Sequence, residues 1–212
     1  MDSGDTAWVL AASALVLLMT PGLAFFYGGL VRRKNIVSTI MYSFVTIGLV
    51  GIVWVLWGYS LAFGPDLEGW KFIGDLQWFG LKDVSANEAG PYSDTIPHQA
   101  FMIFQAMFAI ITPALVTGAF AERMKFSALC IFIVLWVTIV YFPVAHWVFA
   151  FDGFTGPDNV GGWIANTLKA EDFAGGTAVH INAGAAALPD EVPQRRRAGG
   201  QVVGLAAEQH QV

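Results

Sequence analysis

Charged residues and cysteine are both scarce in this 212-residue sequence. Only 13% of the residues are charged, against roughly 25% in an ordinary soluble domain. With 11 lysine and arginine residues against 16 acidic ones, the chain lacks the basic surface that nucleic-acid binding requires. The single cysteine, Cys130, excludes an internal disulfide framework and a cysteine-rich zinc site. The sequence also lacks a phosphate loop, a haem- or metal-binding pattern and a serine nucleophile with acid and base partners, so we predict neither an enzyme nor a cofactor.

Apolar residues take the place of the missing charge, at 56% of the chain. A transmembrane helix needs about 20 mostly apolar residues, and four segments satisfy this requirement. A fifth begins near Phe173 and stops at Leu188, which is too short to cross a bilayer. The sequence therefore predicts an all-α, polytopic membrane helix bundle with about five membrane segments, the fifth incomplete. The four full segments run over about 6–31, 36–63, 100–120 and 126–149.

Basic residues indicate which ends of these segments face the cytoplasm. A basic run at 32–34 follows the first segment, and the connection 121–125 carries two further basic residues. The connections 64–99 and 150–172 are mainly acidic. We therefore predict a multi-pass protein of the cell (plasma or inner) membrane with its N-terminus outside. Residues 1–5 carry two aspartates and no basic residue, so we do not expect a cleaved signal peptide.

Two ionisable residues in or beside the fifth segment are candidates for function. His180 lies eight residues after Asp172, which is about 12 Å along a helix and near the middle of the membrane. A neutral imidazole at that depth can line a pore or bond to a neighbouring helix. Asp172 is expected to cap the helix by accepting from N–H groups two or three residues on. Its negative charge can also attract a cation.

Aromatic residues gather near the predicted outer ends of the third and fourth segments. Phe104 and Phe108 are an i, i+4 pair and share one helix face. They either pack against helices and lipid or flank a narrow path and hold a cation over their rings. Tyr141 and Phe149 form a second aromatic group, for which an interfacial belt is the alternative interpretation. We interpret His146, which lies between them, as interfacial or structural.

Five stretches occur in the order TPGLAFFYGGLVRRKN, WVLWGYSLAFG, FQAMFAIITPALVTGAFAERMKFSA, YFPVAHWVF and DFAGGTAVHINAG. They cover about residues 6–188 and resemble the ammonium transporter (Amt/Mep/Rh) family. The resemblance implies a homotrimer of eleven-helix subunits, each with its own pore and built from two inverted five-helix repeats and a final helix. This chain corresponds to the first repeat, the N-terminal half.

The resemblance also implies roles for residues of this chain in moving ammonium or ammonia across the lipid bilayer, with methylammonium as a second candidate substrate. Phe104 and Phe108 resemble a pair of stacked gating phenylalanines. Phe149 falls at the outer vestibule, where the family usually has tryptophan, and we place Tyr141 with it among the substrate-binding aromatics.

Two further roles follow from the same resemblance. Asp172 matches an aspartate near the mouth of the pore, and His180 matches the first of two histidines that line it. Family members also dock PII-type signalling proteins on a cytoplasmic tail, which we expect to be absent from this chain.

The apolar pattern stops after Leu188, where the family continues a membrane helix. We expect a membrane domain over 1–188 and a polar tail outside the family pattern over 189–212, which a frameshift or a truncated reading frame would explain. Two functions remain open. The chain is either an ammonium transporter with an aromatic gate and a histidine-lined pore, or a truncated, non-transporting membrane fragment that lacks the second half of the pore.

Overall fold

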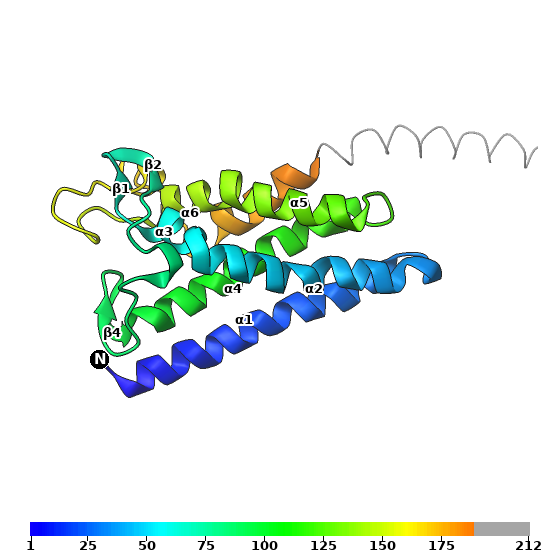
Figure 1. Ribbon diagram of the computed structural model, residues 1–212, viewed down its shortest axis with the longest axis horizontal. Coiled ribbons are helices and arrows are strands. Elements are labelled where there is room, and N and C mark those ends of the chain that lie inside the picture. The colour runs from blue at the N-terminus through cyan, green and yellow to red at the C-terminus, as the bar shows by residue number, and fades with distance from the viewer. Residues whose placement is uncertain (189–212) are drawn as a thin grey trace, which may run out of the picture.

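Long apolar helices run side by side through the computed structural model, which describes residues 1–188 (Figure 1). Within these residues four helices are long and apolar enough to cross a membrane, and they confirm the four predicted segments to within a few residues. They comprise Ser3–Leu30, Arg33–Phe63, His98–Phe120 and Phe126–Phe149. The N-terminus, the strands and the long loops lie at one end of the bundle, here called the outer end, and the tight connections lie at the other.

The first and third of these helices are regular. Helix α1 (Ser3–Leu30) begins at Asp2, whose side chain accepts a hydrogen bond from the backbone N–H of Asp5 at 2.9 Å, as expected of an N-cap. A short 3₁₀ turn, η1 (Arg33–Asn35), leads into the second helix. Helix α4 (His98–Phe120) is the most buried of the four membrane helices in the described bundle.

The second and fourth membrane helices each contain a π-helical turn. The second comprises α2 (Ile36–Val53), η2 (Trp54–Gly58) and α3 (Tyr59–Phe63). The fourth comprises α5 (Phe126–Trp136), η4 (Val137–Tyr141) and α6 (Phe142–Phe149). The indole N–H of Trp57 in η2 donates to the hydroxyl of Thr138 in η4 at 3.2 Å. This hydrogen bond joins the two π turns, and such turns are often found near functional sites.

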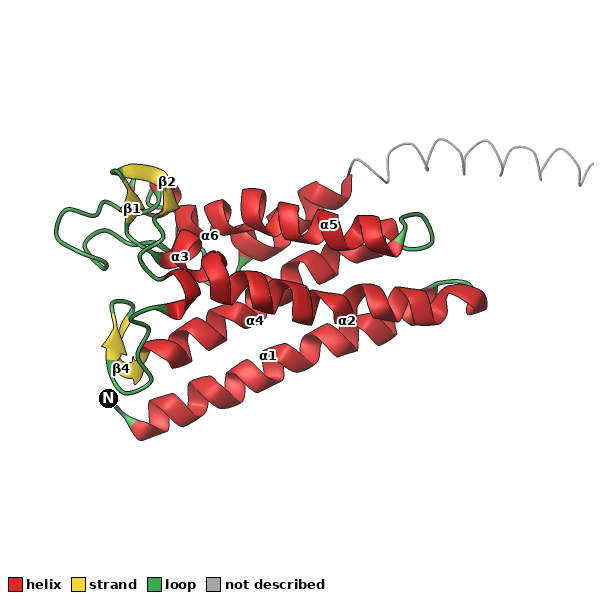
Figure 2. Ribbon diagram, viewed as in Figure 1, coloured by secondary structure: helices red, strands yellow, loops and turns green. Residues whose placement is uncertain are grey.

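Short strands fold back over the outer end of the bundle (Figure 2). Strand β1 (Asp66–Leu67) pairs antiparallel with β2 (Trp70–Gly74), and β3 (Ala89–Gly90) pairs antiparallel with β4 (Ser93–Pro97). The short helices η3 (Phe79–Leu81) and α7 (Trp163–Asn166) lie in the same loops. The fifth segment is a π-helical turn, η5 (Gly176–Ile181), continued by helix over 182–188.

Close contacts at two glycines hold the helices together. A Cβ atom on Gly118 of α4 would lie 2.6 Å from Cζ of Tyr27 on α1, and the Tyr27 hydroxyl donates to the carbonyl of Leu115 at 2.9 Å. A Cβ on Gly58 would lie 2.8 Å from Cε2 of Phe142, which is fully buried. Glycine at these two positions lets an aromatic ring lie directly on the neighbouring backbone.

An ion pair joins the two tight connections opposite the outer end. Arg32 and Glu122 approach to 3.0 Å, and the side-chain amide of Asn35 donates to the same carboxylate at 2.7 Å. Hydrogen bonds from the Arg32 and Asn35 side chains lower the pKa of Glu122 to about 2. The pair links the connection after α1 to the connection after α4, although both side chains lie at the surface.

Candidate functional site

Three of the predicted aromatic residues meet in one cavity at the outer end. The cavity has a volume of about 240 Å³ and lies between α4, α6 and the start of the fifth segment. Phe104 and Phe108 come from α4 and Phe149 comes from the end of α6. The sequence did not indicate the other lining residues, which are Gln105, Phe173, Ala174, Gly175 and Val179.

The rings in the cavity have two different arrangements. Phe104 and Phe108 are edge to face and not stacked, with ring centroids 5.1 Å apart and an interplanar angle of 73°. Their role as a gating pair stays a prediction. Phe149 is nearly parallel to Phe63 of α3, at 6.4 Å and 11°. Phe63 in turn contacts Tyr92 and lies in the buried core. The wall that carries Phe149 is therefore backed by packed aromatic rings.

Asp172 caps the fifth segment, but not through the bonds that the sequence predicted. Its Oδ2 accepts from the backbone N–H groups of Thr177 and Ala178, each at 2.9 Å, which are five and six residues on. The expected spacing of two or three residues was wrong because Gly175, with φ of 76°, makes a left-handed turn before the helix begins. In the described part of the chain Oδ1 is buried without a hydrogen-bond partner.

The other three predicted residues, Asp172, Tyr141 and His180, do not line the cavity. Tyr141 is 2% exposed and packs in the core between Trp136 and Phe142. His180 follows the cavity-lining Val179, yet its own side chain is exposed on the surface of the described bundle. The pore-lining role of His180 and the substrate-binding role of Tyr141 stay predictions.

His146 on α6 lies in a buried network that joins three segments at the outer end. Its Nε2 is 3.0 Å from Oδ1 of Asp66, and its Nδ1 is 3.2 Å from the carbonyl oxygen of Ala62 in α3. The side chains of His146 and Asp66 are 0% and 2% exposed. The other oxygen of Asp66 accepts from the backbone N–H groups of Val160 and Gly161 at 3.1 and 2.9 Å. His146 is thus structural, one of the two interpretations that its position in the sequence allowed.

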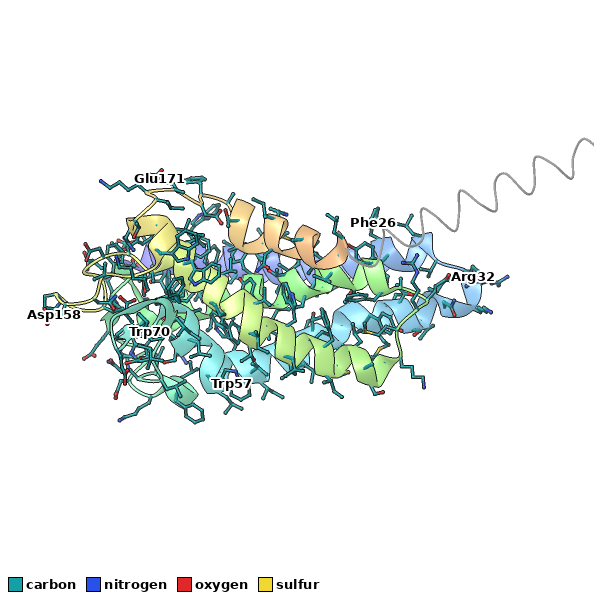
Figure 3. All side chains as sticks on the ribbon, turned by 90° about the horizontal axis from the view of Figure 1, so that it is seen from above. Phe26, Arg32, Trp57, Trp70, Asp158 and Glu171 are labelled. Atoms are coloured by element: carbon teal, nitrogen blue, oxygen red, sulfur yellow. The ribbon has the colours of Figure 1, made fainter. Side chains whose placement is uncertain are left out.

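The charge distribution separates the two ends of the molecule. Asp158 and Glu171 lie at the outer end, and Arg32 lies at the opposite end (Figure 3). The connections 64–99 and 150–172, which lie at the outer end, carry more acidic than basic residues.

Burial raises the pKa of Asp66, but hydrogen bonds from His146, Gly161 and Val160 outweigh this effect and bring the pKa below its usual value. Among residues 1–188 no group of three or more His, Cys, Asp or Glu side chains could hold a metal ion.

These features define a polytopic membrane helix bundle with an aromatic cavity at one end, and comparison with known proteins identifies the family. The chain belongs to the Ammonium Transporter Family, whose sequence profile it matches over residues 7–208. The ammonium transporter of Mycobacterium tuberculosis H37Rv is 54% identical, over 93% of this chain and 44% of that protein. The ammonium transporter of Bacillus subtilis 168 is also 54% identical, over 89% of this chain and 43% of that protein.

Solved structures agree with this assignment. The crystal structure of Candida albicans Mep2 is 37% identical and superposes with a TM-score of 0.74, over 89% of this chain and 38% of Mep2. A structure titled Sensor Amt Protein is 29% identical with a TM-score of 0.71, over 82% of this chain and 40% of that one. The resemblance seen in the sequence and the predicted fold are both confirmed, and the chain is a multi-pass membrane protein for which the plasma membrane fits.

The chain spans less than half the length of the curated relatives it matches. The matched range runs past Leu188 to residue 208, so the family profile does not itself separate the predicted tail from the membrane domain. Residues 189–212 lie outside the described part of the chain. The division at Leu188 therefore stays a prediction.

Proposed function

We propose that this chain supplies the outer vestibule and the upper pore wall of an ammonium transporter. The observation that carries the proposal is the cavity in which Phe104, Phe108 and Phe149 meet beside the segment that starts at Asp172. Ammonium is recruited there from an acidic outer surface, and His180 lines the deeper path that ammonia follows.

The energetics favour holding the cation at the mouth and moving a neutral molecule through the interior. Transferring an isolated charge into a medium of low dielectric costs tens of kcal/mol by Born estimates. A cation over an aromatic face gains only about 0.5–2 kcal/mol, so three rings and one carboxylate offset part of this cost where water is still present. Deeper in the pore the ion releases its proton and passes as ammonia, and a neutral imidazole can donate and accept the hydrogen bonds that this requires.

Phe149 sets the strength of the first step. The phenylalanine ring has a weaker attraction for cations than the indole of tryptophan, which is the best cation–π partner. Gaining about 0.5–1 kcal/mol at this position corresponds to a two- to fivefold lower KM. We therefore expect Phe149→Trp to lower the KM of uptake by this factor.

The test is uptake of labelled methylammonium by cells that lack other ammonium transporters. Phe25 offers a matched control, because it is a phenylalanine on α1 that is 64% exposed and far in sequence from the cavity. We expect Phe108→Ala to abolish uptake and Phe25→Ala to leave it unchanged. A chain that reaches the membrane without any saturable uptake would instead be the non-transporting fragment, and an unchanged KM in Phe149→Trp would contradict the recruiting role.

The assembly and the partners of the protein belong to the same proposal. By its resemblance to the family the chain would form a homotrimer and lie in the lipid bilayer. Docking of a PII-type signalling protein would require a cytoplasmic tail beyond the described residues. Cross-linking in native membranes measures the first, and co-purification with a PII-type protein measures the second.

A further inference from the structure

The hydrogen-bond partners of His146 determine how many protons its ring carries. One ring nitrogen faces the carbonyl oxygen of Ala62, and the other faces a carboxylate oxygen of Asp66. A carbonyl and an ionised carboxylate can only accept hydrogen bonds. A neutral imidazole has a single N–H group, so it would leave one acceptor facing a bare ring nitrogen in a site from which water is excluded.

Two proton arrangements satisfy both contacts. Either the ring is an imidazolium beside ionised Asp66, or a protonated Asp66 donates to a neutral ring. The carboxylate already accepts from the N–H groups of Val160 and Gly161 on its second oxygen. Hydrogen bonds from several N–H donors stabilise the ionised form of a carboxylate, which favours the first arrangement.

We propose that His146 is an imidazolium that, paired with Asp66, fixes the outer end of α6 and thereby positions Phe149 in the cavity wall. His146 lies three residues before Phe149, and Ala62 directly precedes Phe63, the residue that stacks on Phe149. The same pair ties α6 to β1 and, through Asp66, to the backbone at 160–161. The transport consequence of this positioning rests on the function proposed above, whereas the protonation state does not.

His98 provides an internal control with the opposite chemistry. It is also buried, at 5% exposed, but its Nε2 lies 2.6 Å from the hydroxyl of Tyr59. A hydroxyl can donate as well as accept, so this contact is satisfied by a neutral ring. The two buried histidines of the described chain should therefore differ in charge because their partners differ.

The experiment is solid-state NMR of the ¹⁵N-histidine-labelled protein in lipid bilayers at neutral pH, with an affinity tag that contains no histidine. His146 is identified by its through-space contact with the carboxyl carbon of Asp66. We expect two protonated ring nitrogens for His146, with no signal from an unprotonated nitrogen, and one unprotonated nitrogen for His98. An unprotonated nitrogen in His146 overturns the proposal, whether it arises from protonated Asp66 or from a different ring orientation.

Asp66→Asn tests the pairing, because asparagine has the shape of aspartate and can still bond to His146 and to the N–H groups of Val160 and Gly161. The amide of asparagine can donate to a neutral ring, so we expect an unprotonated nitrogen to appear in His146 in this variant. An unchanged imidazolium would show that Asp66 is not its partner and would overturn the proposal. If the variant fails to fold, the spectrum of the unsubstituted protein still decides the protonation state.

Uptake separates this inference from the proposed function. In Asp66→Asn we expect the KM for methylammonium to rise by about two- to fivefold, the loss of one exposed cation–π contact, with kcat retained. Unchanged KM alongside the expected spectral change would overturn the positioning role. No uptake by the unsubstituted protein would contradict the proposed function while the NMR result stands on its own.

Discussion

Replacing Gly58 by alanine is expected to destabilise the bundle at the contact between η2 and the start of α6. The new Cβ atom would lie 2.8 and 2.9 Å from Cε2 and Cε1 of Phe142, closer than carbon atoms can approach without displacement. Phe142 is 0% exposed, and its ring lies 5.6 Å from that of Trp54, so it has no free space to move into. Adding a methyl group to such a packed site typically costs about 1–3 kcal/mol.

Thermal unfolding of the purified protein in detergent, followed by tryptophan fluorescence, measures this effect. For a chain of this size each kcal/mol corresponds to roughly 2–4 °C in Tm, so Gly58→Ala should lower Tm by about 2–12 °C. Gly51→Ala is the matched control, because its Cβ would have no atom within 4 Å, and alanine is favoured over glycine in a helix. Its Tm should stay the same or rise. Equal Tm values for the two variants would refute the packing argument, and partial rescue by adding Phe142→Leu would identify Phe142 as the cause.

Two further predictions concern contacts that hold the helices together. The pKa of Glu122 is lowered to about 2 from 4.5, so the stabilisation from its bonds to Arg32 and Asn35 is fully present above about pH 5 and is lost as the pH falls towards 2. The difference in Tm between the unsubstituted protein and Glu122→Gln should therefore shrink over this acidic range; a constant difference would contradict the assignment. Tyr27→Phe removes the hydrogen bond to the carbonyl of Leu115 and should cost about 1 kcal/mol in the same assay, whereas an unchanged Tm would show that this bond contributes nothing.

Local patterns in the sequence were sufficient for the membrane helices. Each of the four apolar runs is long enough to cross a bilayer and ends at charged or turn-forming residues. The i, i+4 spacing of Phe104 and Phe108 was likewise enough to place their rings on one helix face, and the two rings do meet. These features depend on helix geometry alone, which a sequence specifies directly.

Contacts at the outer end were beyond the reach of such patterns. Strand β1 has only two residues, too few for an alternating pattern to be recognised. The predicted spacing between Asp172 and the N–H groups that it caps was wrong, because the left-handed turn at Gly175 lies between them. In the second case the decisive feature is a backbone turn in a loop, and many sequences can form such a turn.

The sequence by itself determined the number and length of the four full membrane helices, because burial in a bilayer demands continuous apolar runs. Their direction across the membrane stays a prediction from the charge bias between the two sides. Only the tertiary structure decided that Phe149 shares a cavity with Phe104 and Phe108, and that His146 faces two acceptors at once. Asp66 and His146 are 80 residues apart in the chain. Pairing over such a distance follows from how helices and loops pack, which no local pattern encodes.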